Sequence, residues 1–347
     1  MPRPQTVFSE LQIALAIVDK DWHRIKNVDG ESKSIYEEEL QRRLSTDKTS
    51  VDELHKTGGK IKKLLLKRNL SAGFLVTWTG KDKIQEYGAV GHDLLIDEAD
   101  LRVSVKENAQ LFQNPSPFKV FEKWPNGIFE KSRDSDWFIH TAPKELNNYY
   151  LKCSGPKFSG YKDILSYYQN VGGKGERKKF STYVADLHSS SNAAVLASYE
   201  QLCRKVSDKS ASIFNTNIAA TLALSNKQLS KNQALAKLFA FYFRLDSNHY
   251  TLCGTENSLS FAVEVQDLKN WEDCFELLGV KASALTRGQP EVLLTFDFLD
   301  KKTSNKFSRK IRSEVRWSHG KFCGNPEAKL YKHDSWSYSD LPWAKSV

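Results

Sequence analysis

The chain has 347 residues, of which 40% are hydrophobic and 12% aromatic, so it carries enough apolar material for a sizeable core. That composition excludes a fibrous or disordered chain, and no apolar run of about eighteen residues predicts a membrane span. Its 51 basic residues outnumber 42 acidic ones, and the net charge of +9 favours a polyanionic partner. Without a signal-like N-terminus, the sequence predicts a cytoplasmic protein with no membrane partner.

The cysteines are few and widely spaced, and they stand at positions 153, 203, 253, 274 and 323. They form no CxxC pair, and no histidine lies at zinc-finger spacing from them. We therefore expect five ordinary thiols in a reducing compartment, and neither a zinc site nor a disulfide framework.

The first predicted elements are helices, and strands follow them. Apolar residues at helical spacing predict helices over residues 8–25, 32–44 and 51–67. Ser50 and Glu53 form a plausible capping box at the start of the third helix. Branched and aromatic residues then predict strands over 73–80, 93–97 and 101–106, the last two joined by a short acidic turn.

The middle of the chain is predicted to be helical, and strands return near its end. The helical patterns cover residues 164–171, 193–206 and 234–243, and the later strands cover 249–254, 258–265, 291–299 and 311–318. The stretches QNPSP (113–117) and GGKGERKK (172–179) are predicted to be loops. The sequence therefore predicts an α/β fold with a mixed core over 1–150, a helical region over 151–250 and a β-rich part over 251–347.

The segment from 91 to 117 carries the pattern that best predicts chemistry. Asp93 begins one strand and Lys106 ends the next, and two strands joined by a turn bring these positions together. A side-chain period of two points Ser104 and Lys106 to one side and turns Val105 into the core. A carboxylate there could hold Mg²⁺ beside a phosphodiester, and a lysine could orient the attacking water or offset developing charge.

Two further residues could complete this site. Glu37, on the helix that precedes the strands, could supply a second carboxylate for the metal, and Glu38 and Glu39 compete for that role. Asn108 could orient the lysine or contact a phosphate of the nucleic acid.

These residues resemble the PD-(D/E)XK signature of type II restriction endonucleases. In that signature an Asp, a strand and a turn precede Glu or Asp, any residue, and Lys; here Asp93 precedes Ser104-x-Lys106. The string SVKEN resembles a subset with Ser in the acidic position, and Glu37 after an aromatic resembles the upstream helical Glu. The resemblance covers about thirty residues plus that helix, and it implies a restriction-endonuclease-like mixed sheet flanked by helices, Mg²⁺ dependence and a DNA substrate.

The chain departs from the signature at two positions. Ser104 replaces the carboxylate, so without Glu37 the metal would be held by Asp93, a backbone carbonyl and waters, which predicts a weak or inactive enzyme. His92 stands where the idealised motif has Pro. An alternative interpretation is structural, because an Asp at a strand start and a Lys at a strand end also solvate edge strands.

Basic residues outside this segment are candidates for DNA contacts. The sequence singles out Lys174, Arg177, Lys178 and Lys179 in the glycine-rich stretch, and Arg316 and Lys321 near a predicted turn. Trp317, His319, Lys321 and Lys329 could form an aromatic and basic nucleic-acid surface. A structural hairpin whose aromatic side chains pack inward is the alternative, and the pattern slightly favours it.

The sequence thus favours a Mg²⁺-dependent, sequence-specific endonuclease for double-stranded DNA. It would act as a homodimer, so that both strands are cut, and a cognate DNA methyltransferase that acts on the same site would be its partner. A non-catalytic DNA-binding protein on a degraded nuclease scaffold is the first alternative, and a structure-directed repair nuclease is the second.

Overall fold

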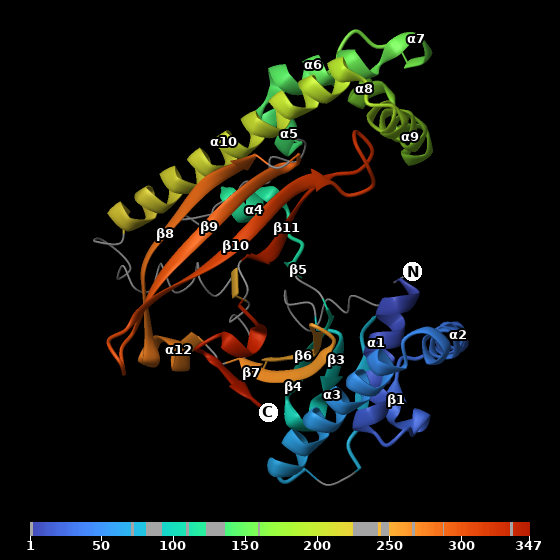
Figure 1. Cartoon of the computed structure of the whole chain (residues 1–347), viewed down its shortest axis with the longest axis vertical. Helices are drawn as coiled ribbons and strands as arrows, with labels where there is room; N and C mark the ends of the chain where they lie inside the picture. The colour runs from blue at the N-terminus through green and yellow to red at the C-terminus, as the bar shows by residue number, and fades with distance from the viewer. Residues whose placement is uncertain are drawn as a thin grey trace. The chain divides into compact units, whose positions relative to one another are not determined.

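The structure is a computed structural model, and it describes residues 3–70, 73–80, 92–108, 111–122, 136–158, 160–224, 242–243, 250–265, 268–286, 288–333 and 336–347. The chain forms two compact units, each containing a sheet and helices (Figure 1). Unit 1 comprises 1–110, 239–275 and 335–347, and unit 2 comprises 111–238 and 276–334. The predicted α/β class is confirmed.

The predicted domain boundaries need correction, because each sheet pairs strands that lie far apart in the sequence. The boundary at 150 falls inside helix α6 (Pro143–Cys153), and the segment 1–150 is divided between the two units. The boundary at 250 falls at the start of strand β6 (Tyr250–Glu256), which belongs to unit 1.

Unit 1 begins with the helices α1 (Pro4–Ile17), α2 (Gly30–Thr46) and α3 (Lys48–Lys67), with η1 (Trp22–Arg24) and β1 (Ile25–Lys26) between the first two. Asp29 caps α2, because its carboxylate accepts a hydrogen bond from the amide of Ser32. Asp47 caps α3 in the same way through the amide of Ser50. The expected Ser50 cap was therefore wrong, since α3 begins one turn earlier.

The sheet of unit 1 is mixed and has the strand order β1-β2-β3-β4-β6-β7-β12. Its other strands are β2 (Val76–Trp78), β3 (Leu94–Ile96), β4 (Leu101–Glu107), β7 (Leu259–Val265) and β12 (Ala344–Ser346). β2, β3 and β4 are antiparallel neighbours, and β4 runs parallel to β6. Unit 1 also contains η3 (Asp97–Ala99), α12 (Leu268–Cys274) and η4 (Tyr338–Asp340).

Helices α1, α2 and α3 share one apolar core with the sheet. Phe8 of α1 and Leu54 of α3 are fully buried in a cluster that also contains Trp78, Leu94 and Val103 of the strands. Alternate residues of β3 and β4 face this core, as a side-chain period of two requires. The strand residues between them therefore point to the other face of the sheet.

Gly58 allows α1 and α3 to cross closely, and Gly58→Ala is expected to destabilise the protein. A Cβ at Gly58 would lie 2.5 Å from Cβ of Ala16 and 2.5 Å from the carbonyl oxygen of Ile13. Overpacking of this kind costs about 1–3 kcal/mol. Gly59→Ala is the matched control, because a Cβ there meets no described atom within 4 Å and alanine favours helix. Thermal denaturation measures both variants, and an equal melting temperature for Gly58→Ala and wild type would contradict the prediction.

Unit 2 contains an antiparallel sheet in the order β5-β11-β10-β9-β8. Its strands are β5 (Leu111–Gln113), β8 (Phe275–Thr286), β9 (Pro290–Asp300), β10 (Lys306–Trp317) and β11 (Pro326–His333). Besides α6, its helices are α4 (Pro117–Phe121), α5 (Trp137–Thr141), α7 (Gly155–Phe158), α8 (Ile164–Asn170), α9 (Lys174–Ser189) and α10 (Ala193–Leu224). The long helix α10 runs along this sheet (Figure 1) and packs on β9.

Several predicted elements differ from the structure. Helix α9 begins at Lys174, so the loop predicted over 172–179 was wrong, and the long strand β8 was not predicted. The helix predicted over 234–243 lies outside the described residues except for 242–243. All five cysteines are free thiols, as expected. Within the described parts of the chain, no helix combines the length and hydropathy needed to cross a membrane.

Candidate functional site

Asp93 lies at the turn where the chain enters β3, directly beside the end of β4. Its Oδ2 atom accepts a hydrogen bond from the amide of Val105 at 2.6 Å and another from Oγ of Ser104 at 3.2 Å. The amide of Asp93 donates to the carbonyl of Val103 at 2.8 Å. Asp93 therefore meets β4 at Ser104 and Val105, just before Lys106, and this placement follows from the antiparallel register that pairs Leu94 with Val103.

Glu10 is a second carboxylate at this place, and it comes from α1. It is only 5% exposed, and its Oε2 accepts a hydrogen bond from Nε1 of Trp78 at 2.6 Å. Burial raises the pKa of Glu10 to about 8, and the negative charge of Asp93 also raises it, whereas the Trp78 bond and the positive charge of Lys106 lower it. Glu10, Asp93 and Lys106 therefore form one electrostatically interacting group.

Glu37 is not in this group among the described interactions. It is exposed on α2, whereas Tyr36 is buried and stacks on Phe8 at 5.4 Å between ring centroids. Glu39, the other buried residue of this turn, binds Arg42 and Arg43. A helical period of 3.6 turns residues 36 and 39 toward α1 and residues 37 and 38 toward solvent. We therefore replace Glu37 by Glu10 as the second carboxylate.

A signal for Glu10 does exist in the sequence. The helix VFSELQIALAI contains one carboxylate among mainly apolar residues, and all eleven of its residues are buried. A carboxylate seldom occupies such a position unless it is paired, protonated or bound to a cation. The sequence of this helix therefore marks Glu10 as an unusual residue, but it does not predict which strand Glu10 contacts.

The donor chemistry fits a hard cation such as Mg²⁺. Among the described residues, no group of three or more His, Cys, Asp or Glu side chains is arranged to hold a metal ion. The site offers the two carboxylates of Glu10 and Asp93, whose mutual repulsion contributes to the raised pKa of Glu10. Mg²⁺ is commonly held by one or two carboxylates and takes its other ligands from water and substrate phosphates.

Comparison with known proteins assigns no family. No family model, no curated protein and no solved structure matches this chain. The site is therefore interpreted from its own residues and geometry.

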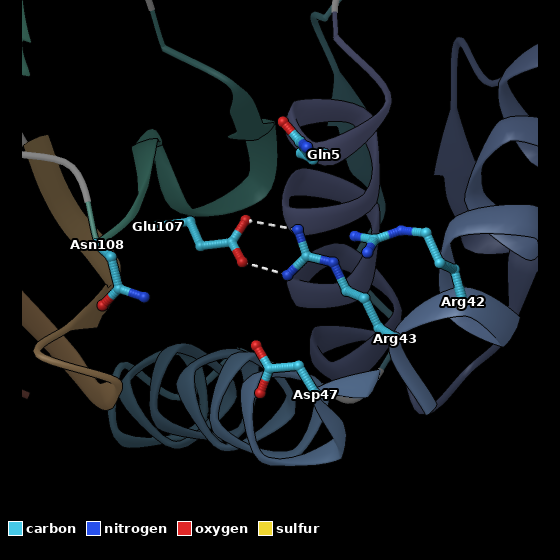
Figure 2. A pocket seen from close by; sticks show the side chains of 6 residues that line it. All are labelled: Gln5, Arg42, Arg43, Asp47, Glu107 and Asn108. Atoms are coloured by element: carbon cyan, nitrogen blue, oxygen red, sulfur yellow. Dashed lines mark hydrogen bonds and ion pairs between the residues drawn. The ribbon is translucent and has the colours of Figure 1, made fainter. Parts of the chain in front are cut away.

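Asn108, predicted to touch DNA or the lysine, has a structural role at the end of β4. Its side-chain Oδ1 accepts a hydrogen bond from the backbone amide of Ser258 at 2.8 Å. Its backbone amide donates to the carbonyl of Thr255 at 2.7 Å. The residue adopts a left-handed backbone conformation with φ of 46°. It also lines a polar pocket, whose other lining residues are Gln5, Arg42, Arg43, Asp47 and Glu107 (Figure 2).

The residues of unit 2 predicted to contact DNA fall into two groups. The side chains of the first group contact other groups of the protein. Arg177 donates to the carbonyls of Val171 at 2.7 Å and Tyr168 at 2.9 Å, at the C-terminal end of α8. Arg316 forms an ion pair with Glu327 at 3.1 Å. Lys321 lies 4.6 Å from the ring centre of Tyr199, and burial lowers its pKa.

The second group stays available to a ligand. Lys178 and Lys179 are exposed on α9, although Lys178 also donates to the carbonyl of His319 at 3.4 Å. The side chain of Lys174 lies outside the described residues.

Trp317 of β10 is buried and is not available to a nucleic acid. It is 4% exposed and stacks on Phe138 at 3.9 Å between ring centroids, so the hairpin with inward-packing aromatics is confirmed.

Proposed function

We propose that the chain is a Mg²⁺-dependent endonuclease that hydrolyses phosphodiester bonds in double-stranded DNA, with a restriction-endonuclease-like core in unit 1. One observation carries the proposal: Asp93, bound to the end of β4, shares an electrostatic site with the buried Glu10 and with Lys106. The net charge of +9 supports a polyanionic substrate. A homodimer would cut both strands, and a methyltransferase would protect the same sequence.

Each charged residue has a distinct task in this reaction. Glu10 and Asp93 would hold Mg²⁺, which when bound neutralises the phosphate and lowers the pKa of a coordinated water. Lys106 is the penultimate residue of β4 and its positive charge acts on Glu10, so its ammonium group can orient the attacking water and offset the negative charge that builds on the phosphorus centre. Both functions require Lys106 to be held in register with Asp93.

Ser104 supports this site without supplying a charge. Its side chain is 1% exposed and donates a hydrogen bond to Oδ2 of Asp93. That bond, together with the one from the amide of Val105, fixes the orientation of the carboxylate. Glu10 would provide the second negative charge that the serine cannot, once it gives up its proton to bind the cation.

Ser104 also favours the second candidate, a non-catalytic DNA-binding protein on a nuclease scaffold. A hydroxyl in the acidic position leaves two carboxylates for the metal, and a site with weak metal affinity can lose turnover while the protein still binds DNA. Such a protein would show salt-sensitive DNA binding without Mg²⁺-dependent cleavage.

Purified protein incubated with phage DNA, with and without Mg²⁺, distinguishes these functions on a gel. Discrete fragments that require Mg²⁺ are the expected result, and they would identify the recognition sequence. A smear would indicate a structure-directed or non-specific nuclease. Intact DNA that shifts in a binding gel would support the non-catalytic protein, and intact DNA without a shift would contradict both candidates.

A further inference from the structure

Glu107, the residue after Lys106, is held by side chains from three helices. Arg43 of α2 forms an ion pair with both carboxylate oxygens of Glu107 (Figure 2), with a distance of 3.1 Å from Nη2 to Oε2. Ser50 of α3 donates to Oε1 at 3.1 Å, and Ser9 of α1 donates to Oε2. The end of β4 is thus attached to α1, α2 and α3 through one carboxylate.

Arg43 is itself fixed by its surroundings. It is 5% exposed, its Nε donates to Glu39 at 2.9 Å, and its Nη1 donates to Ser50 at 2.8 Å. Its guanidinium carbon lies 4.6 Å from the ring centre of Phe8. Hydrogen bonds from Arg42 first, and then from Arg43, lower the pKa of Glu39 to about 2, so that carboxylate stays ionised near neutral pH. Ser9, Glu39, Arg43, Ser50 and Glu107 are hereafter the Glu107 network.

The Glu107 network adjoins two residues of the candidate site in the sequence. Ser9 precedes Glu10, and Glu107 follows Lys106, so the Ser9–Glu107 hydrogen bond links the two backbone segments that carry these residues. Glu107 and Lys106 are consecutive residues of β4, so the contacts that hold Glu107 also fix the backbone that carries Lys106.

Strand β6 packs closely against the backbone of Lys106 in β4. Gly254 of β6 is the register partner of Lys106, and its φ of +141° favours glycine. A Cβ at Gly254 would lie 1.8 Å from the carbonyl oxygen of Lys106. Thr57 of α3 donates to the carbonyl of Gly254 at 2.7 Å, so this strand is also attached to the helices.

We propose that the Glu107 network positions Lys106 relative to Glu10 and Asp93 for the reaction. The inference rests on the proposed nuclease function, and it makes Ser9, Arg43 and Glu107 positioning residues that do not touch the substrate. Buried ion pairs add little net stability, because desolvation offsets their attraction, but they fix geometry. A displacement of about 1 Å at a catalytic group can cost on the order of 100-fold in rate.

Glu107→Gln in the full-length protein tests this role. The substitution keeps the shape of the side chain but removes the charge that holds Arg43. The single-turnover cleavage rate at saturating Mg²⁺ and DNA is expected to fall about 10- to 100-fold, while the Kd for DNA changes less than about twofold. Glu264→Gln is the matched control, because it breaks the ion pair between Glu264 of β7 and Arg68, the residue that follows α3 in the same unit.

Ser9→Ala is the second variant, in case Glu107→Gln fails to fold. It removes one hydrogen bond to Glu107 and leaves the Arg43 ion pair, so a smaller loss of rate, about 3- to 10-fold, is expected with unchanged DNA binding. Melting temperatures of all variants separate lost stability from lost positioning.

The outcomes separate the inference from the proposed function. Rates that fall in Glu107→Gln and Ser9→Ala but not in Glu264→Gln would support the positioning role. A wild-type rate in both network variants would overturn that role and leave the nuclease intact. Equal rate losses in all three variants would also overturn it, because a general structural defect explains them. Absence of cleavage by the wild-type protein would overturn the nuclease and the positioning role together.

Discussion

Lys106→Ala is expected to lower the DNA cleavage rate by about 10²- to 10⁴-fold, the usual contribution of a positioned proton-transfer or charge-stabilising group. Lys106 is the penultimate residue of β4 and follows Val105, whose amide binds Asp93, and its positive charge acts on the buried carboxyl of Glu10. Binding of DNA should change little, because a long duplex contacts many basic residues and loses only one of them. Single-turnover cleavage and a binding gel measure the two quantities separately.

Lys60→Ala provides the matched control for the loss of one positive charge. Lys60 lies on α3 in the same unit, and its Nζ donates to the carbonyl of Ser260 at 2.7 Å. This variant should cut DNA at nearly the wild-type rate and show the same small loss of affinity. Full cleavage by Lys106→Ala would remove the central residue of the proposed mechanism and contradict the nuclease assignment.

The strands of unit 1 could be predicted because their signals are local. Alternation of apolar residues located β3 and β4, and the short turn between them set the register that brings Asp93 to Ser104. The partner of β4 on its other side could not be predicted, because β6 lies about 150 residues further along the chain. The first segment of unit 2, residues 111–238, lies between these strands in the sequence, and no local periodic pattern reveals their pairing.

In unit 2, residue type and residue spacing predict different structures for α9. The glycines before Arg177 predicted a loop, but Phe180 and Val184 lie four residues apart and are both buried, and their packing stabilises α9. In β8, the polar and small residues between Val280 and Thr286 weaken the apolar pattern of the strand. Tertiary pairing with β9 overrides that weak local preference.

The sequence predicts only those residues of the candidate site that local strand spacing brings together. Asp93, Ser104 and Lys106 follow from strand spacing, whereas Glu10 depends on how α1 lies across the sheet, and its contact with Trp78 spans 68 positions. Glu37 matched a pattern of residue types, an acid after an aromatic. The helical period shows that such an acid turns away from the core when the aromatic turns toward it.

Glu10→Gln is expected to remove a pH dependence of stability from the metal-free protein. Burial raises the pKa of Glu10 from 4.5 to about 8, so the folded chain keeps a proton that the unfolded chain loses above pH 4.5. The folded state therefore binds more protons between these two values, and its stability falls as pH rises through them, by about 1.4 kcal/mol for each pH unit. Glutamine carries no such proton, and its amide can still accept the bond from Trp78.

Melting temperatures in EDTA at pH 5, 6.5 and 8 measure this effect. The wild type should lose stability relative to Glu10→Gln as the pH rises, and the variant should be the more stable protein at pH 8. Glu53→Gln is a suitable control, since the bond from Lys56, and after it the amide of Ser260, lower the pKa of Glu53, so this carboxylate is ionised in both states from pH 5 to 8 and its removal should not change the slope. Parallel curves for the wild type and Glu10→Gln would show that Glu10 is ionised in the folded protein.

The proton on Glu10 also competes with metal binding. Glu10→Gln is therefore expected to have its largest effects on Mg²⁺ binding and on DNA cleavage. A carboxylate must lose its proton before it binds a cation, so Mg²⁺ should raise the melting temperature of the wild type more at pH 8 than at pH 6.5. Glu10→Gln should lose that stabilisation and reduce cleavage by at least about 100-fold, because only Asp93 would remain as a charged ligand. Equal Mg²⁺ stabilisation of both proteins would place the cation elsewhere and exclude Glu10 from the metal site.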